Sequence, residues 1–207
     1  MPGCVVVLNG VPRSGKSSIA AAIQQSFDGL WINLGVDTWF RATPERFRPG
    51  IGLRPGGERP DLEASVATLY AALYESIAAH SRLGIHVVAD LGHHDGYSRP
   101  LGILQDCARR LAGLPALLVG VRCPIDVIMA RRNAGPGDSP VRYATGTTEV
   151  PVPPPVQRFQ DAVHVPGIYD LEVDTSVLSP EACAATIAAR LKQGIPSPSA
   201  FERLVRL

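Results

Sequence analysis

Residues 4–27 read CVVVLNGVPRSGKSSIAAAIQQSF, and this segment sets the architecture of the chain. It opens with an apolar run, residues 4–8, whose β-branched side chains are typical of a buried strand. Apolar residues recur at helical spacing over residues 16–27, which predicts a helix. Between the two, residues 10–17 complete the pattern G-x-x-x-x-G-K-[ST]. A strand, a glycine-rich turn and a helix in this order predict a loop that binds phosphate groups.

The residue types in this loop suit phosphate chemistry. Glycine lets the backbone bend until successive N–H groups face an anion, and the following helix adds its positive N-terminal end. We expect Lys16 to reach the β- and γ-phosphates of ATP and Ser17 to bind Mg²⁺. The alternative is a plain strand-to-helix turn, but the helix dipole disfavours a lysine in the first turn of such a helix. The predicted nucleotide-binding residues are Gly10, Val11, Pro12, Arg13, Ser14, Gly15, Lys16, Ser17 and Ser18.

Further apolar runs and helical patterns alternate along the rest of the chain. The runs cover residues 30–35, 85–89, 116–121 and 169–173, and the helical patterns cover residues 62–80, 98–111, 125–132 and 180–192. Alternation of this kind predicts a parallel sheet covered by helices on both faces. No break in composition divides the 207 residues, so we expect one domain over residues 1–207. The predicted fold is α/β, with a five-stranded, mostly parallel sheet.

Two segments interrupt this alternation because they are rich in proline and glycine. They are residues 43–60 and residues 134–155. Long irregular connections inside a compact domain are often lids or binding loops. We interpret the first as the side on which an acceptor binds and the second as a lid. The alternative is that both are ordinary surface loops.

Two aspartates follow predicted strands, at the edge where α/β sheets bind ligands. Asp90 ends the apolar run before it and is predicted to hold Mg²⁺, the alternative being a cap or turn residue. Asp37 lies at the predicted start of a helix, where an N-cap is one interpretation. The other is a general base that takes the proton of an acceptor hydroxyl during phosphoryl transfer.

Histidines and arginines beside the predicted loops are further candidates. His93 and His94, with Asp95, follow Asp90, and we interpret them as a polar loop lining the acceptor pocket, since no spaced third ligand suggests a metal site. Arg131 and Arg132 close a predicted helix just before the lid segment. Arginine in such a place can neutralise the charge of a moving phosphoryl group. The alternative is that both arginines are solvent-exposed and are simply favoured by the helix dipole at the C-terminal end of the helix.

Composition excludes several other functions. The net charge is +1 and only 6% of residues are aromatic, which disfavours nucleic acid as a partner or substrate. Four widely spaced cysteines argue against a metal knuckle or a disulfide framework. No segment resembles a secretion signal or a membrane span, so we expect a cytoplasmic location and no membrane partner. A homo-oligomer is compatible with the sequence.

Together these residues resemble the chloramphenicol phosphotransferase-like proteins, which belong to the nucleoside/shikimate-kinase group of P-loop kinases. The resemblance covers nearly the whole chain. It rests on the phosphate loop and on five short motifs, Leu8-Asn9-Gly10, Leu34-Gly35-Val36-Asp37, Val119-Gly120-Val121-Arg122-Cys123, Ala162-Val163-His164 and Tyr169-Asp170-Leu171-Glu172-Val173-Asp174-Thr175. The resemblance implies a single-domain P-loop kinase fold with a lid segment.

The resemblance also implies residue roles. Asp37 is the catalytic base, Lys16 and Ser17 serve ATP and Mg²⁺, and the arginines near Arg131 form part of a lid. This chain departs from the family at Gly135, where relatives carry an arginine, and Arg132 or Arg142 is the candidate substitute.

The sequence therefore predicts an ATP-dependent O-phosphotransferase. It would move the γ-phosphoryl group to a hydroxyl of a small molecule, a chloramphenicol-like antibiotic or a related metabolite. The alternative is a regulatory or adaptor protein that binds ATP without phosphorylating an acceptor. The two differ at Asp37, because only a kinase needs a base facing the acceptor.

Overall fold

A computed structural model describes residues 1–48, 53, 55, 59–134 and 144–207. Its centre is one five-stranded sheet in the order β2-β3-β1-β4-β5, and each neighbouring pair is parallel. The predicted α/β fold is thereby confirmed. β1 lies in the middle of the sheet and its five residues are buried. The strands are β1 (Val5–Asn9), β2 (Trp31–Asn33), β3 (His86–Leu91), β4 (Ala116–Arg122) and β5 (Leu171–Asp174).

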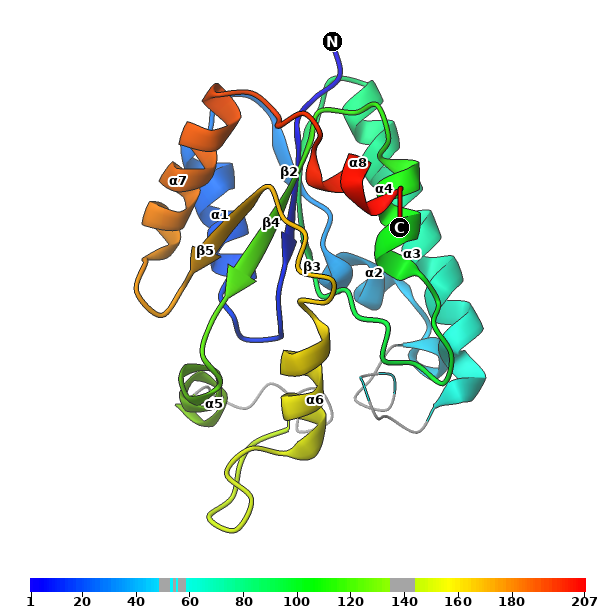
Figure 1. The fold of residues 1–207 in the computed structure, drawn as a ribbon, viewed down its shortest axis with the longest axis vertical. Coiled ribbons are helices and arrows are strands. Elements are labelled where there is room, and N and C mark those ends of the chain that lie inside the picture. Colours follow the sequence, from blue (N-terminus) through cyan, green and yellow to red (C-terminus); the bar gives the residue numbers. More distant parts are fainter. Residues whose placement is uncertain (49–52, 54, 56–58, 135–143) are drawn as a thin grey trace.

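Helices cover both faces of the sheet (Figure 1). On one face lie α1 (Lys16–Ser26) and α7 (Pro180–Lys192), and on the other lie α3 (Glu63–Arg82), α4 (Ile103–Arg110) and α8 (Ala200–Leu204). Side chains alternate along β1, so that Val6 and Leu8 pack under α1 and α7 while Val5 and Val7 pack under the other three helices. The residues of β1 therefore contribute to two hydrophobic clusters, one on each face of the sheet. This is why the strand has no polar face.

Three further helices lie towards the carboxyl ends of the strands, where Figure 1 shows α5 and α6 together. They are α2 (Val36–Ala42), α5 (Ile125–Ala134) and α6 (Pro154–Ala162), and short 3-10 helices span Glu45–Phe47 and Pro60–Leu62. A small apolar cluster fixes α5 and α6 against the start of the phosphate loop. It consists of Val11, Cys123, Ile128, Phe159 and Val163.

The two segments predicted to be irregular are described only in part. Of residues 43–60, the described portion includes a 3-10 helix and the buried Leu53. Residues 135–143 of the predicted lid, with Gly135 and Arg142, lie outside the described residues. The segment predicted to be irregular ends earlier than residue 155, because α6 begins at Pro154. Proline fits the first turn of a helix, where its missing N–H has no partner to lose.

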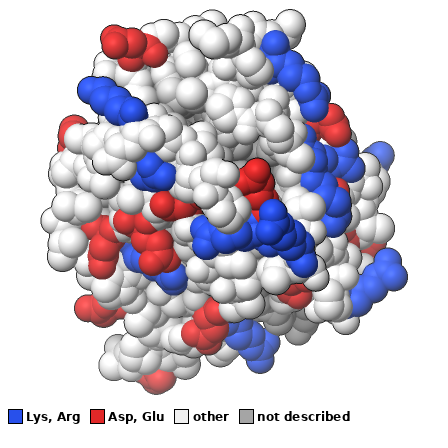
Figure 2. All heavy atoms as spheres, turned by 45° about the horizontal axis from the view of Figure 1, so that its top comes forward, with Lys and Arg blue, Asp and Glu red and all other residues white. Residues whose placement is uncertain are grey.

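The distribution of charged side chains and the state of the cysteines agree with what the composition predicts. Acidic and basic side chains are interspersed on the face shown in Figure 2, as a net charge of +1 leads one to expect. All four cysteines are free. Across the described ranges, the helices are too short or too polar to traverse a bilayer.

Candidate active site

The phosphate loop is held between the ends of β3 and β4. The N–H of Gly10 donates to Leu91 O at 3.3 Å, and a Cβ on Gly10 would lie 2.6 Å from Val121 O, so this position admits only glycine. The loop then passes through two left-handed residues, Arg13 with φ 72° and Gly15 with φ 93°. Successive turns of this kind present backbone N–H groups to one side, which makes an anion-binding concavity.

Lys16 and the serines after it open α1. The first turn of α1 has no acidic residue, so the positive end of the helix dipole is not offset there. Lys16 Nζ donates to Val11 O at 2.7 Å, which places the ammonium group across the loop. Ser17 and Ser18 are exposed at the same end of the helix. The ammonium group of Lys16, the N-terminus of α1 and the phosphate loop therefore lie together, as a phosphate-binding site requires.

Ser17 and Asp90 are in direct contact. Ser17 Oγ donates to Asp90 Oδ2 at 2.6 Å, and Asp90 is buried as the fifth residue of β3. Asp90 is therefore a strand residue, and the alternative of a helix cap does not apply to it. A hydroxyl and a carboxylate oxygen are the ligand types that Mg²⁺ prefers, so this pair fits the predicted metal site.

Asp37 lies in the first turn of α2, two residues after Gly35. The N-cap of α2 is Gly35, which has no side chain to cap the helix and whose N–H donates to Asn33 Oδ1 at 3.0 Å. The N-cap interpretation of Asp37 is therefore wrong. The start of α2 packs closely against Asp90, because a Cβ on Gly35 would lie 1.6 Å from Asp90 Oδ1. The carboxylates of Asp37 and Asp90 thus come from neighbouring strand ends, as β2 and β3 pair in the sheet.

Both predicted arginines contact the phosphate loop. Arg131 Nη1 donates to Arg13 O at 3.3 Å, and the buried Arg132 donates through Nη2 to Pro12 O at 3.5 Å. Arg132 Nη1 also donates to Ala144 O at 3.2 Å, at the described end of the lid segment. Two positive charges therefore lie directly behind the loop, where they favour an anion on its other side.

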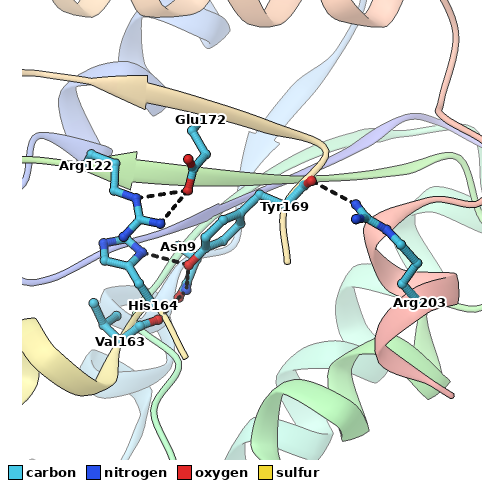
Figure 3. A network of polar contacts seen from close by, with 7 residues as sticks. All are labelled: Asn9, Arg122, Val163, His164, Tyr169, Glu172 and Arg203. Carbon is cyan, nitrogen blue, oxygen red and sulfur yellow. Dashed lines mark hydrogen bonds and ion pairs between the residues drawn. The ribbon is translucent and has the colours of Figure 1, made fainter. Parts of the chain in front are cut away.

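Asn9, to which the sequence assigned no role, connects β1 to other segments at the strand ends, and Figure 3 shows it beside Val163 and Tyr169. Its Nδ2 donates to Val163 O at 2.8 Å and to Tyr169 Oη at 2.9 Å, and its Oδ1 accepts the backbone N–H of His93 at 2.8 Å. Tyr169 Oη in turn lies 2.7 Å from His164 Nδ1. Burial, with the charges of Arg122 and Lys16, lowers the pKa of His164 to about 4, so Nδ1 of the neutral ring accepts the Tyr169 hydroxyl proton.

His93 faces the core, which corrects its predicted place in the acceptor pocket. It is 1% exposed, and its Nε2 lies 2.7 Å from Tyr74 Oη while Nδ1 lies 3.2 Å from Asn9 Oδ1. Burial, with the neighbouring His94, lowers the pKa of His93 to about 3, so the ring is neutral. Nδ1–H then donates to Asn9 and Nε2 accepts from Tyr74.

His94 is buried in an aromatic stack. Its ring stacks on Tyr97 with centroids 4.4 Å apart and meets the edge of Phe159 from α6 at 5.0 Å. The described residues contain no group of three potential metal ligands that includes either histidine. The loop after β3 is therefore mainly structural, and it ties α6 to the strand ends.

An apolar cleft opens between α2 and α3. Its empty volume of about 310 Å³ includes open solvent, and its lining is Val36, Trp39, Phe40, Thr43, Val66, Leu69, Tyr70 and Leu73. Thr43, Trp39 and Tyr70 carry the polar groups of this lining, and Thr43 Oγ1 already donates to Trp39 O at 2.7 Å. Val36 precedes Asp37 directly, so the cleft begins beside the candidate base.

Comparison with known proteins places this geometry in a family. The model of the family described as "Chloramphenicol phosphotransferase-like protein" matches residues 3–192. A curated relative, "Putative O-phosphotransferase Rv2636" of Mycobacterium tuberculosis (strain ATCC 25618 / H37Rv), is 28% identical over 98% of this chain and 88% of its own length.

Solved structures show the same fold at lower identity. A sugar kinase from Janibacter sp. HTCC2649 gives a TM-score of 0.63 at 17% identity, over 93% of this chain and 95% of that one. The Mycobacterium tuberculosis APS kinase CysC, in complex with AMPPNP and APS, gives 0.57 at 16% identity, over 92% and 98%. The loop, the fold and these likenesses are those of a small-molecule kinase, and the chain belongs to the chloramphenicol phosphotransferase-like family.

Proposed function

We propose that this protein is an ATP-dependent O-phosphotransferase that moves the γ-phosphoryl group of ATP to a hydroxyl of a small molecule. One observation carries the proposal: Gly35, at the start of α2, packs against Asp90, whose carboxylate accepts from Ser17 of the phosphate loop, and Asp37 lies in the first turn of that helix. A protein that only binds ATP needs the loop and the metal site. A carboxylate in the first turn of this helix supplies what phosphoryl transfer needs in addition, a proton acceptor.

The loop residues bind the donor in this proposal. The loop of residues 10–18 cradles the phosphates with backbone N–H groups, except at Pro12, which has none, and at Gly10 and Ser14, whose N–H groups are bonded within the protein. Lys16 exchanges its bond to Val11 O for one to the β- and γ-phosphate oxygens. Ser17 and Asp90 would hold Mg²⁺, which would supply positive charge to neutralise that of the phosphates. Arg131 and Arg132 add positive charge from behind the loop.

Asp37 acts on the acceptor. Its carboxylate takes the hydroxyl proton as the acceptor oxygen forms a bond to the γ-phosphorus, and the bond from that phosphorus to the β–γ bridging oxygen breaks to release ADP. The described part of the cleft between α2 and α3 offers almost no hydrogen-bonding group, so it suits an apolar or aromatic portion of the acceptor. A chloramphenicol-like antibiotic or a related metabolite has such a portion.

The remaining assignments concern residues near the lid. We propose that residues 134–155 close over bound nucleotide, since Arg132 connects the phosphate loop to Ala144. Closure would exclude water and so favour transfer to the acceptor over hydrolysis. Arg142, outside the described residues, is the candidate for a further lid arginine.

The test is a screen of hydroxylated antibiotics and metabolites, chloramphenicol included, for ADP release that depends on the acceptor. Products are identified by mass spectrometry as phosphate esters. Lys16→Ala should abolish the activity, and Lys192→Ala, at the far end of α7, should not. ATP binding without ester formation on any acceptor would instead favour a regulatory or adaptor protein.

A further inference from the structure

Thr175, the residue after β5, lies against the phosphate loop. Its Oγ1 donates to Ser14 O at 2.7 Å, and the other acceptor within reach, Arg122 O, is farther away at 3.4 Å. Its N–H donates to Arg122 O at 3.1 Å, which continues the pairing of β5 with β4. The sheet therefore fixes the position from which the hydroxyl reaches the loop.

Arg131 fixes the same residue from the other side. Its Nη2 donates to Thr175 O at 2.6 Å and its Nη1 donates to Thr175 Oγ1 at 3.0 Å. Nη1 also lies 3.3 Å from Arg13 O and 3.4 Å from Cys123 Sγ. Because the guanidinium is planar and rigid, one side chain locks the Thr175 hydroxyl as an acceptor for Arg131 and a donor for Ser14 O.

This contact determines the direction of a peptide unit in the loop. In a planar trans peptide the C=O and the following N–H point to opposite sides. The carbonyl of Ser14 is held towards Thr175, so the N–H of Gly15 points away from Thr175. Gly15 itself is left-handed, with φ 93°, and a Cβ there would lie 3.3 Å from Thr175 Cγ2.

We propose that Thr175 is a positioning residue for phosphate binding, which aims the N–H of Gly15 at the nucleotide phosphates and is itself locked by Arg131. The inference rests on the proposed function only in taking the anion to be a nucleotide phosphate. It adds a residue outside the G-x-x-x-x-G-K-[ST] motif to the phosphate site, and it gives Arg131 a second role besides its charge. Without the hydroxyl, the peptide between Ser14 and Gly15 can rotate and the donor is lost.

The experiment compares Thr175→Val, which keeps the shape but removes the hydroxyl, with Thr175→Ser, which keeps the hydroxyl. The affinity of the full-length protein for ADP with Mg²⁺ is measured by calorimetry, without any acceptor. Thr175→Val should bind ADP about tenfold more weakly, the equivalent of one hydrogen bond, and Thr175→Ser should stay within about threefold of wild type. Thr186→Val, which removes an exposed hydroxyl on α7, is the control and should bind normally.

A second readout separates positioning from packing. Addition of ADP should shift the ¹⁵N–¹H signal of Gly15 in the wild type and in Thr175→Ser, and much less in Thr175→Val. If Thr175→Val does not fold, Arg131→Lys takes its place, because lysine cannot make the paired bonds to Thr175, and it should weaken ADP binding and reduce the same shift.

The outcomes are distinct. Wild-type ADP affinity in Thr175→Val, or in Arg131→Lys where Thr175→Val does not fold, overturns the inference and leaves the proposed function intact. An equal loss of affinity in the valine and serine variants shows that only packing matters, and it also overturns the inference. A wild-type protein that does not bind ADP overturns both, whereas one that binds ADP but phosphorylates no acceptor removes only the proposed function.

Discussion

The carboxylate of Asp90 occupies the space that a side chain on Gly35 would need. A Cβ on Gly35 would lie 1.6 Å from Asp90 Oδ1 and 2.9 Å from Asp90 O. The backbone at the start of α2 thus forms one wall around the carboxylate that accepts from Ser17. Any movement of α2 is thereby coupled to the proposed metal site.

Gly35→Ala should therefore disrupt two functions at once. The new methyl group must displace either the Asp90 carboxylate or the first turn of α2, which carries Asp37. We expect phosphoryl transfer to fall by roughly 10²-fold, the usual effect of misplacing reacting groups by about 1 Å, and the Mg²⁺ requirement to rise. The measurement is the transfer rate as a function of Mg²⁺ concentration. Gly113→Ala is the control for backbone strain alone, because a Cβ there meets nothing within 4 Å, whereas its φ of 77° is unfavourable for alanine.

Asp37→Asn should separate transfer from nucleotide binding. The amide keeps the size of the side chain but cannot accept the hydroxyl proton, so transfer should fall by about two to four orders of magnitude. ATP affinity, measured by titration, should stay near wild type. Asp126→Asn, at the same second position in the first turn of α5, is the matched control. Normal transfer in Asp37→Asn would show that this carboxylate is not the base.

The buried histidine His93 should make the protein sensitive to acid. Its pKa is lowered to about 3 from 6.5, so below pH 6.5 the unfolded chain takes up a proton that the folded protein refuses. Stability should therefore decrease as the pH falls from about 6.5 towards 3, by about 2 kcal/mol between pH 7 and pH 5 from this residue.

The check is the free energy of unfolding in urea for wild type and His93→Gln at both pH values. Glutamine cannot titrate, and other groups change equally in both proteins. The variant should be less stable at pH 7, and its disadvantage should shrink by about 2 kcal/mol at pH 5. Parallel pH dependences would mean that the pKa of His93 is the same in the folded and unfolded chain.

Asn9→Leu should destabilise the strand ends. Leucine has a similar size, but it leaves the N–H of His93 and the carbonyl of Val163 without their bonds in a buried place. We expect a loss of roughly 2–4 kcal/mol in the free energy of unfolding. Tyr169→Phe, which removes a hydroxyl from the same network, should cost less, about 1 kcal/mol, because the Asn9 bonds to the backbone remain. Equal losses would show that Asn9 acts through Tyr169 alone.

The sequence predicted those parts of the molecule that local pattern determines. The run over residues 4–8 became β1, Val5–Asn9, and the helix over residues 180–192 matches α7, because apolar periodicity reports burial directly. α8 escaped prediction since five residues carry too little periodicity, although a Ser199–Glu202 capping box marks its start. That signal could have revealed it.

The residues of the candidate site also fall into those that local sequence could predict and those that it could not. Ser17 and Asp90, which the sequence assigned to one metal site, are in contact, and each could be found because a motif and a strand end have sequence signatures. The inward direction of His93 depends on Tyr74, 19 residues earlier, and the contact of Thr175 with Ser14 spans 161 residues. No local pattern encodes contacts of that kind, since they arise from how the strands are ordered in the sheet.

The central place of β1 has a consequence for how the protein opens. β1 pairs with strands on both sides and all its residues are buried, while the edge strands β2 and β5 have three and four residues. We expect the amides of β1 to exchange with deuterium only when the whole domain unfolds, and those of the edges to exchange through local opening. The phosphate loop follows directly after β1, the most protected strand. Local opening of β2 or β5 can therefore occur without release of a bound nucleotide.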